Sequence, residues 1–251
     1  MSNILVLGDS FASSEEGNPH FLELWGNKHN HNVNCIGMPG ASPVAIASEF
    51  IKKDLRNVDV AFYFIANFLG ASLSFEGSES ISDESKLMPK TYDQHFLYNF
   101  TRLLEYVSTS KSTLHDPNKH VRLNLLEHDK LTPLQQELIK GFYTGVEPEW
   151  LFRANYFAMC NIFTRLKKHN AKVVIVFPRS GLYEKKISKI MVDVEEDIEQ
   201  LIKMKNISPG VEKKYVSHLS NHLGPEDAKE TAELFEEYLQ KTPNIKALLN
   251  K

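Results

Sequence analysis

The sequence predicts an α/β protein built on a doubly wound parallel sheet. Short apolar segments alternate with segments whose apolar residues recur at helical spacing, which is typical of parallel strands joined by helices. Residues 60–65 are apolar on both faces, as expected of a central strand that helices cover. The length of 251 residues suits one such domain with an insertion.

Outside the insertion, the pattern predicts four clear strands, five helices, a short edge strand and a helical tail. The predicted strands are residues 4–7, 33–36, 60–65 and 172–177. The predicted helices are residues 21–25, 42–55, 147–169, 187–204 and 225–239. Ser42 suits an N-cap and Pro43 the first helical position. A stripe of apolar residues from Trp150 through Phe157 to Leu166 is expected to face the core. Residues 207–217 are expected to form a short edge strand and a loop, and 243–251 a helical tail.

An insertion covers about residues 69–146 of this single predicted domain, 1–251. A compact α/β unit needs a far shorter connection there. Apolar residues at helical spacing predict helices over 92–107 and 131–143. The insertion is expected to be helical and to form a lid over the strand ends. A decorative or oligomer-forming helical pair is the alternative.

Composition excludes several classes of protein. The formal net charge of −3 gives no electrostatic reason to bind nucleic acid or an anionic membrane. Cys35 and Cys160 are too few for a disulfide framework and are expected to be buried free thiols. His20, His29 and His31 are interpreted as solvent-facing loop or helix-end residues, and no metal site is expected. With no predicted signal peptide or transmembrane segment, a cytoplasmic location is expected.

The first strand ends in a turn, Gly8-Asp9-Ser10, that presents a serine. Open α/β sheets bind their ligands at the carboxyl ends of their strands, so this hydroxyl lies where a ligand is expected. A plain strand-to-helix turn capped by Asp9 or Ser10 is the structural alternative. The short motif alone does not distinguish the two.

Three later segments extend the pattern. A glycine turn, residues 37–40, follows the second strand. Asn67 follows the third strand, and His222 stands just before the last helix. Serine, glycine, asparagine and histidine in this order resemble the four motif blocks of the SGNH (GDSL-type) hydrolases. The resemblance covers nearly the whole chain and implies a three-layer, flavodoxin-like α/β/α sheet.

The resemblance implies a role for each motif residue. Ser10 is the nucleophile and His222 the base that takes its proton. The oxyanion hole is formed by the backbone N–H groups of Ser10 and Gly40 and by the side-chain amide of Asn67. Gly37 is the lesser candidate for the glycine. Asp9 is expected to support the turn through hydrogen bonds.

Two motif blocks depart from the family's pattern. The family's histidine usually has an aspartate three residues before it, and here that position is Leu219. The third block normally ends in aspartate, and here Phe68 follows Asn67. A Ser–His dyad or a catalytically weak binding protein fits these changes. His218 competes with His222 for the role of base.

The expected function is therefore hydrolysis of an acetyl or short-chain acyl ester, without a cofactor. The substrate is a small-molecule or carbohydrate ester, and the sequence leaves the acyl group and the oligomeric state open. The alternative is an SGNH-fold binding protein that uses the insertion as a partner surface. A nucleotide-binding domain fits poorly, because the turn at Ser10 lacks a glycine-rich phosphate loop and a following lysine.

Overall fold

A computed structural model describes most of the chain outside the predicted insertion. The described residues are 1–37, 42–51, 53–65, 71–74, 95–98, 148–178, 200–216 and 221–250. Contacts divide the chain into two compact units. The first comprises Met1–Pro39, Ile46–Ala66 and Met159–Lys251, and the second comprises Gly40–Ala45 and Asn67–Ala158.

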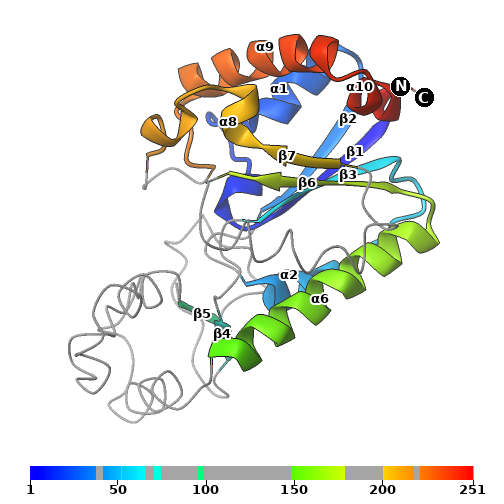
Figure 1. The fold of residues 1–251 in the computed structure, drawn as a ribbon, viewed down its shortest axis with the longest axis vertical. Helices are drawn as coiled ribbons and strands as arrows, with labels where there is room; N and C mark the ends of the chain where they lie inside the picture. The colour runs from blue at the N-terminus through cyan, green and yellow to red at the C-terminus, as the bar shows by residue number, and fades with distance from the viewer. Residues whose placement is uncertain are drawn as a thin grey trace. The chain divides into compact units, whose positions relative to one another are not determined.

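The main sheet has five parallel strands in the order β2-β1-β3-β6-β7 (Figure 1). The strands are β1 (Asn3–Gly8), β2 (Asn32–Gly37), β3 (Val60–Phe64), β6 (Lys172–Phe177) and β7 (Gln200–Lys203). The pairing is parallel throughout, with Gly8 opposite Gly37 on one side and Phe64 on the other. This order is the flavodoxin-like one. The predicted doubly wound sheet is confirmed.

Helices and short turns complete the described architecture. They are η1 (Ser10–Ala12), α1 (Phe21–Lys28), α2 (Pro43–Phe50), α6 (Pro148–Lys168), α8 (Met204–Ile207), η5 (Val211–Lys213), α9 (Pro225–Lys241) and α10 (Pro243–Leu249). The Ser42 hydroxyl accepts from the Ala45 N–H at 3.4 Å, which confirms the predicted cap. Pro43 is the first residue of α2, as predicted.

One face of the sheet carries a hydrophobic core of the first unit. Figure 1 shows α1, α9 and α10 together on this face. Alternate residues of β3, among them Phe62 and Phe64, point into it. Phe235 of α9 meets Phe62 and Phe21 edge-on, at ring-centroid distances of 6.1 and 5.9 Å. Because this core fixes α9 against the sheet, it also fixes the segment that leads into α9.

The other face is covered by the second half of α6. Tyr63 of β3 is fully buried and meets Phe163 edge-on at 5.8 Å. Arg165 donates to the carbonyl groups of Phe50 and Ile51 and so ties the end of α2 to α6. Helices on both faces explain why β3 is apolar in every position.

The predicted position of the apolar stripe on α6 is wrong in the first half of the helix. Trp150 and Phe157 are 56% and 68% exposed. The buried positions include Asn155, Met159 and Ile162, so the stripe is displaced by about one residue. The buried amide at Asn155 accepts from the Val44 N–H at 3.3 Å. Because a hydrogen-bonded polar residue occupies a buried position, the hydropathy pattern does not show which face of the helix is buried.

The strand at the β7 edge of the sheet was predicted in the wrong place. Residues 200–203 form β7, whereas the sequence predicted the end of a helix there and a strand within 207–217. Leu201 is 43% exposed and Ile202 is buried, which is strand alternation over only four residues. So short a segment fits a helical stripe equally well. The rest of that predicted helix, 187–199, lies outside the described residues.

The insertion contains a strand where a helix was predicted. β4 (Ala71–Ser74) pairs antiparallel with β5 (His95–Tyr98), and β5 lies inside the predicted helix 92–107. The helix prediction is therefore wrong at residues 95–98. The four residues there, His-Phe-Leu-Tyr, are mostly aromatic and apolar, which suits a short strand as well as a helix turn. The predicted helix 131–143 lies outside the described residues, and the single domain and the lid stay predictions.

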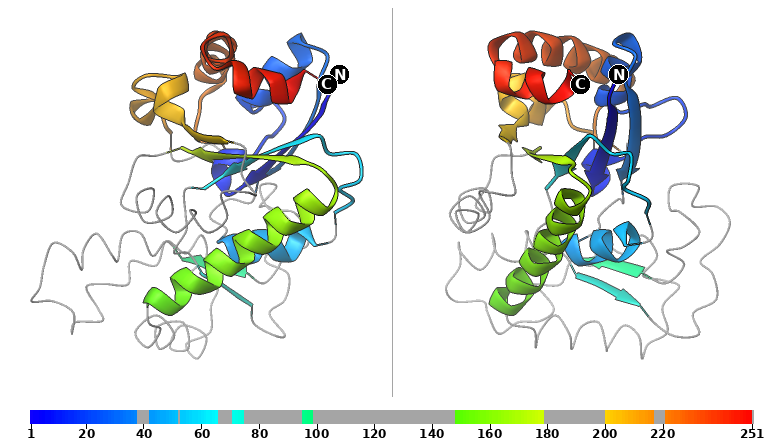
Figure 2. Two further views of the ribbon diagram at one scale, coloured as in Figure 1. Left: turned by 45° about the vertical axis from the view of Figure 1, so that its right-hand side comes forward. Right: turned by 90° about the vertical axis from the view of Figure 1, so that its right-hand side faces the viewer.

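The two ends of the described chain lie side by side (Figure 2). The Ser2 hydroxyl is buried and donates to the Leu249 carbonyl at 2.8 Å. This bond joins the residue before β1 to the end of α10. Among the described residues, none of the helices has both the length and the apolar character needed to cross a membrane.

Candidate active site

The turn that carries Ser10 begins where β1 ends. Gly8 has φ of +152°, and a Cβ atom there would lie 2.4 Å from the Phe64 carbonyl oxygen. The buried Asp9 then caps η1, since its Oδ1 accepts from the Phe11 N–H at 3.1 Å. Ser10 is half-buried at the start of this turn. Strand, glycine and cap together direct the hydroxyl out of the carboxyl end of the sheet.

Gly37, at the end of β2, packs directly against the chain that follows Ser10. A Cβ atom on Gly37 would lie 2.1 Å from the Ser13 backbone nitrogen. Only glycine permits this approach. The contact gives Gly37 a packing role beside the serine turn. Gly40, the preferred oxyanion-hole glycine, lies outside the described residues.

His222 stands in a turn just before α9. Its backbone φ is +62°, which is uncommon for a residue with a side chain. Its carbonyl accepts from the Val216 N–H at 2.7 Å. Pro225 begins α9 three residues later, as predicted. The backbone of the proposed base is thus held in an unusual conformation.

The structure brings Ser10 and His222 together. Ser10 Oγ lies 2.5 Å from His222 Nε2, a hydrogen bond between residues 212 positions apart. Both residues are half-buried. An imidazole nitrogen at this distance can take a proton from the hydroxyl. The pair therefore has the geometry of a nucleophile and its base.

Aromatic rings surround the imidazole. The Phe11 ring stacks on it with centroids 4.3 Å apart and an interplanar angle of 29°. Tyr215 meets Phe11 edge-on at 4.9 Å, and its hydroxyl donates to the Pro178 carbonyl at 2.8 Å. Since Phe11 follows Ser10 directly, one short turn supplies both the hydroxyl and a wall for the imidazole.

His20 is buried, which corrects its interpretation as a solvent-facing residue. It is the N-cap of α1: its Nδ1 accepts from the Leu22 N–H at 3.2 Å. Burial lowers the pKa of His20 to about 3, so the ring is neutral at pH 7. The proton is then on Nε2, which donates to the Phe11 carbonyl at 3.0 Å. His20 therefore ties α1 to the serine turn.

The structure describes only some of the other predicted residues. Asn67, His218, Leu219 and Phe68 lie outside the described residues. His29 and His31 each stack on Trp25 at 5.0 Å, and His29 Nε2 lies 3.1 Å from a Glu236 oxygen. The two cysteines are free thiols, as predicted, but each is half-buried. Burial raises the pKa of the Cys35 thiol.

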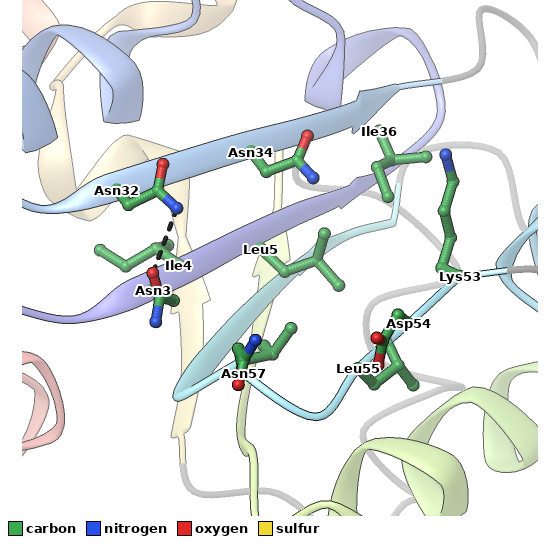
Figure 3. A pocket seen from close by; sticks show the side chains of 11 residues that line it. Asn3, Ile4, Leu5, Asn32, Asn34, Ile36, Lys53, Asp54, Leu55 and Asn57 are labelled. Atoms are coloured by element: carbon green, nitrogen blue, oxygen red, sulfur yellow. Dashed lines mark hydrogen bonds between the residues drawn. The ribbon is translucent and has the colours of Figure 1, made fainter.

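A hollow of about 290 Å³ lies at a different part of the first unit (Figure 3). Its lining includes Asn3 and Leu5 of β1, Asn34 of β2, and Lys53 and Asn57 before β3. These positions belong to the early part of β1 and the approach to β3, whereas Ser10 follows the carboxyl end of β1. The hollow is therefore separate from the Ser10–His222 pair.

The residues that hold the two turns are not among the site residues that the sequence predicts. They are Phe11, Asn18, His20 and Asn221. One signal was available, because His20 and Glu23 form a capping box at the start of α1. That pattern would have placed His20 at a helix start. The contacts between Asn18 and Asn221 join distant segments and leave no local pattern.

Neither a family model nor a curated protein matches the chain. Among solved structures, it is similar to a protein assigned to the G-D-S-L family of lipolytic proteins from Desulfitobacterium hafniense. The TM-score is 0.48 and the identity 11%, over 95% of this chain and 100% of that one. It is also similar to the YXIM protein of Bacillus subtilis, with a TM-score of 0.46 and 12% identity over 96% of this chain and 57% of that one. At these levels the assignment of a function depends on the residues of this chain.

Proposed function

We propose that the protein is a serine hydrolase of the SGNH type that cleaves an acetyl or other short acyl ester. The observation that carries the proposal is the 2.5 Å hydrogen bond between Ser10 Oγ and His222 Nε2. A serine hydroxyl is a weak nucleophile at neutral pH and needs a base within this reach. The site lies at the carboxyl end of β1, where folds of this order bind ligands.

The proposed reaction has two steps. Ser10 Oγ attacks the acyl carbonyl carbon while His222 Nε2 takes its proton and then gives it to the leaving alcohol. This forms an acyl-serine and releases the alcohol. A water molecule then attacks the acyl carbon, again losing a proton to His222, which returns it to Ser10 as the acid leaves. These steps need no cofactor.

The oxyanion of each step needs donors on the opposite side from the imidazole. The proposal assigns them to the Ser10 N–H, the Gly40 N–H and the Asn67 amide. The sequence resemblance supports this assignment. Loss of one such donor typically costs about 2.7–4 kcal/mol of transition-state stabilisation. Replacing Asn67 by alanine is expected to slow hydrolysis roughly 100-fold or more while the protein stays folded.

A binding protein on the same scaffold is the competing proposal. Leu219 replaces the residue that usually orients the histidine, and loss of such an acid can cost about 10⁴ in turnover. In that case the protein would bind an ester or a partner without cleaving it. Activity of the serine separates the two proposals.

The experiment is labelling with a fluorophosphonate probe, followed by hydrolysis of nitrophenyl acetate, butyrate and octanoate. The variants are Ser10→Ala and His222→Asn, because asparagine tolerates the positive φ at this position. The wild type is expected to label and to prefer the short esters. Each variant is expected to lose up to about 10⁶-fold in rate.

Ser208→Ala is the matched control, since it removes a different buried serine hydroxyl. It is expected to label at the wild-type rate. Labelling of Ser10→Ala at that rate would refute the assignment of the nucleophile. A folded wild type that neither labels nor hydrolyses any of the three esters would favour the binding protein.

A further inference from the structure

The turn that carries His222 is held by an amide clamp. Asn221 is 3% exposed, and its Oδ1 accepts from the Leu223 N–H at 3.0 Å. This bond spans His222 and closes the turn in which His222 has its positive φ. A left-handed residue with a side chain costs roughly 1–2 kcal/mol. The Asn221 side chain therefore helps to keep His222 in a conformation that it would not otherwise adopt.

The same amide joins this turn to a distant loop. Asn221 Nδ2 donates to the carbonyl groups of Asn18 and Pro19 at 3.1 and 3.4 Å. Asn18 Nδ2 donates in return to Asn221 Oδ1 at 3.3 Å. Asn18 is also buried. Hydrogen bonds away from water hold their geometry well, because breaking one leaves a buried polar group without a partner.

The loop that receives the clamp also holds the serine turn. His20 donates through Nε2 to the carbonyl of Phe11, the residue after Ser10. Asn18, Pro19 and His20 are consecutive, so one short segment binds the turns of both Ser10 and His222. We call residues 18–20 the brace. The brace therefore contacts the turns on both sides of the Ser10–His222 hydrogen bond.

From these contacts we infer that Asn221 is a positioning residue, which sets the imidazole of His222 against Ser10 by clamping the 221–223 turn to the brace. The inference rests on the proposed function of the Ser10–His222 pair. Asn221 acts on the backbone beside His222, with Phe11 stacked on the ring from the other turn. An aspartate three residues before the histidine, the position of Leu219, would instead act on the ring itself.

The test measures the labelling kinetics of Asn221→Ala with the fluorophosphonate probe. The rate constant kinact is expected to fall about 100-fold, the size of effect that a misplacement of about 1 Å produces. The apparent binding constant KI is expected to stay within about twofold, because Asn221 does not lie at the proposed nucleophile. Asn18→Ala removes one bond of the clamp and is expected to lower kinact about fivefold.

Asn155→Ala is the matched control. It removes another buried amide that accepts from a backbone N–H, that of Val44. Its kinact is expected to equal that of the wild type even if its melting temperature falls. If Asn221→Ala labels as fast as the wild type, or if Asn155→Ala loses as much as Asn221→Ala, the inference is wrong.

A second readout does not depend on reactivity. Long-range ¹⁵N–¹H NMR spectra report the hydrogen bonding of each imidazole, and the His222→Asn variant assigns the His222 signals. The Nε2 signal of His222 is expected to shift in Asn221→Ala and to stay in place in Asn155→Ala. If the wild-type protein does not react with the probe at all, the proposed function is wrong. If the His222 signals are unchanged in Asn221→Ala, the positioning role of Asn221 is wrong, whatever the outcome for the function.

Discussion

The turn that carries Ser10 and the turn that carries His222 are held in different ways. The groups that fix the Ser10 turn are near it in sequence. Gly8 lets the chain pass close to the Phe64 carbonyl oxygen, and Asp9 caps η1. The His222 turn also depends on a distant residue, because Asn18 bonds to Asn221 from 203 positions away in the sequence. One turn is built by its own residues, and the other is held by the rest of the fold.

This difference has a consequence for the chemistry. The serine turn needs the strand before it, room beside Gly37 and the bond from His20 to the Phe11 carbonyl. The histidine turn needs α1, the brace and α9 to be correctly packed before the imidazole reaches Ser10. Substitutions near Ser10 should therefore disturb folding and reactivity together, whereas substitutions in the distant contacts should separate the two.

Gly37→Ala should give the largest effect on the serine turn. The added Cβ would lie 2.1 Å from the Ser13 nitrogen, and backbone cannot move as a side chain can. We expect the free energy of unfolding, measured in urea, to fall by about 3 kcal/mol. The fluorophosphonate labelling rate should fall in the same variant.

Gly224→Ala is the control for this glycine. Its φ is −67°, and a Cβ there would lie 3.7 Å from an Asp227 oxygen, which is ordinary contact. A loss of under about 1 kcal/mol is expected from the change of helix cap. Equal losses in the two variants would show that Gly37 does not hold the serine turn by close packing.

The brace should make stability depend on pH through His20. In the unfolded chain this histidine takes a proton near pH 6.5, but in the folded protein burial lowers its pKa to about 3. The unfolded state therefore binds more protons between these values, and the free energy of unfolding should fall as the pH drops from 6.5 toward 3. The slope from this one group is at most about 1.4 kcal/mol per pH unit.

His20→Asn tests this dependence, because asparagine can still cap α1 but does not titrate. Urea unfolding of wild type and variant at pH 7, 5.5 and 4.5 gives the comparison. The wild type should lose more stability than the variant as the pH falls. Equal losses in both would exclude His20 as the source.

Phe11→Leu should give the smallest change in stability while still slowing the reaction. Leucine keeps an apolar side chain but loses the ring that stacks on His222, and we expect a loss of about 1 kcal/mol. The labelling rate should fall because the imidazole of His222 loses the aromatic ring that stacks on it. The measurements are urea unfolding and the labelling rate.

Phe163→Leu is the matched control on the other face of the sheet, where the ring meets Tyr63 edge-on. It should cost a similar amount of stability and leave the labelling rate unchanged. If both variants slow labelling equally, the effect of Phe11 comes from general loosening of the core.

The sequence by itself determined the doubly wound sheet, its central strands and the helix that begins at Pro225. These depend on hydropathy within short segments, and on glycine, proline and capping residues at their ends. It also singled out Ser10 and His222, through a resemblance in which each motif lies at a strand end or before a helix. Signals of this kind are local, so they survive without knowledge of the partner segments.

Tertiary structure alone decided which residues hold the pair together. Phe11 and Asn221 are unremarkable in the sequence, because packing chooses their distant partners, and the capping box at His20 gives no sign of its bond to Phe11. The same is true of the errors: β7 and β5 have four residues each, and the pairing that makes them strands comes from a neighbouring strand. A hydrogen bond between residues 203 positions apart depends on the whole fold, and no window of sequence contains it.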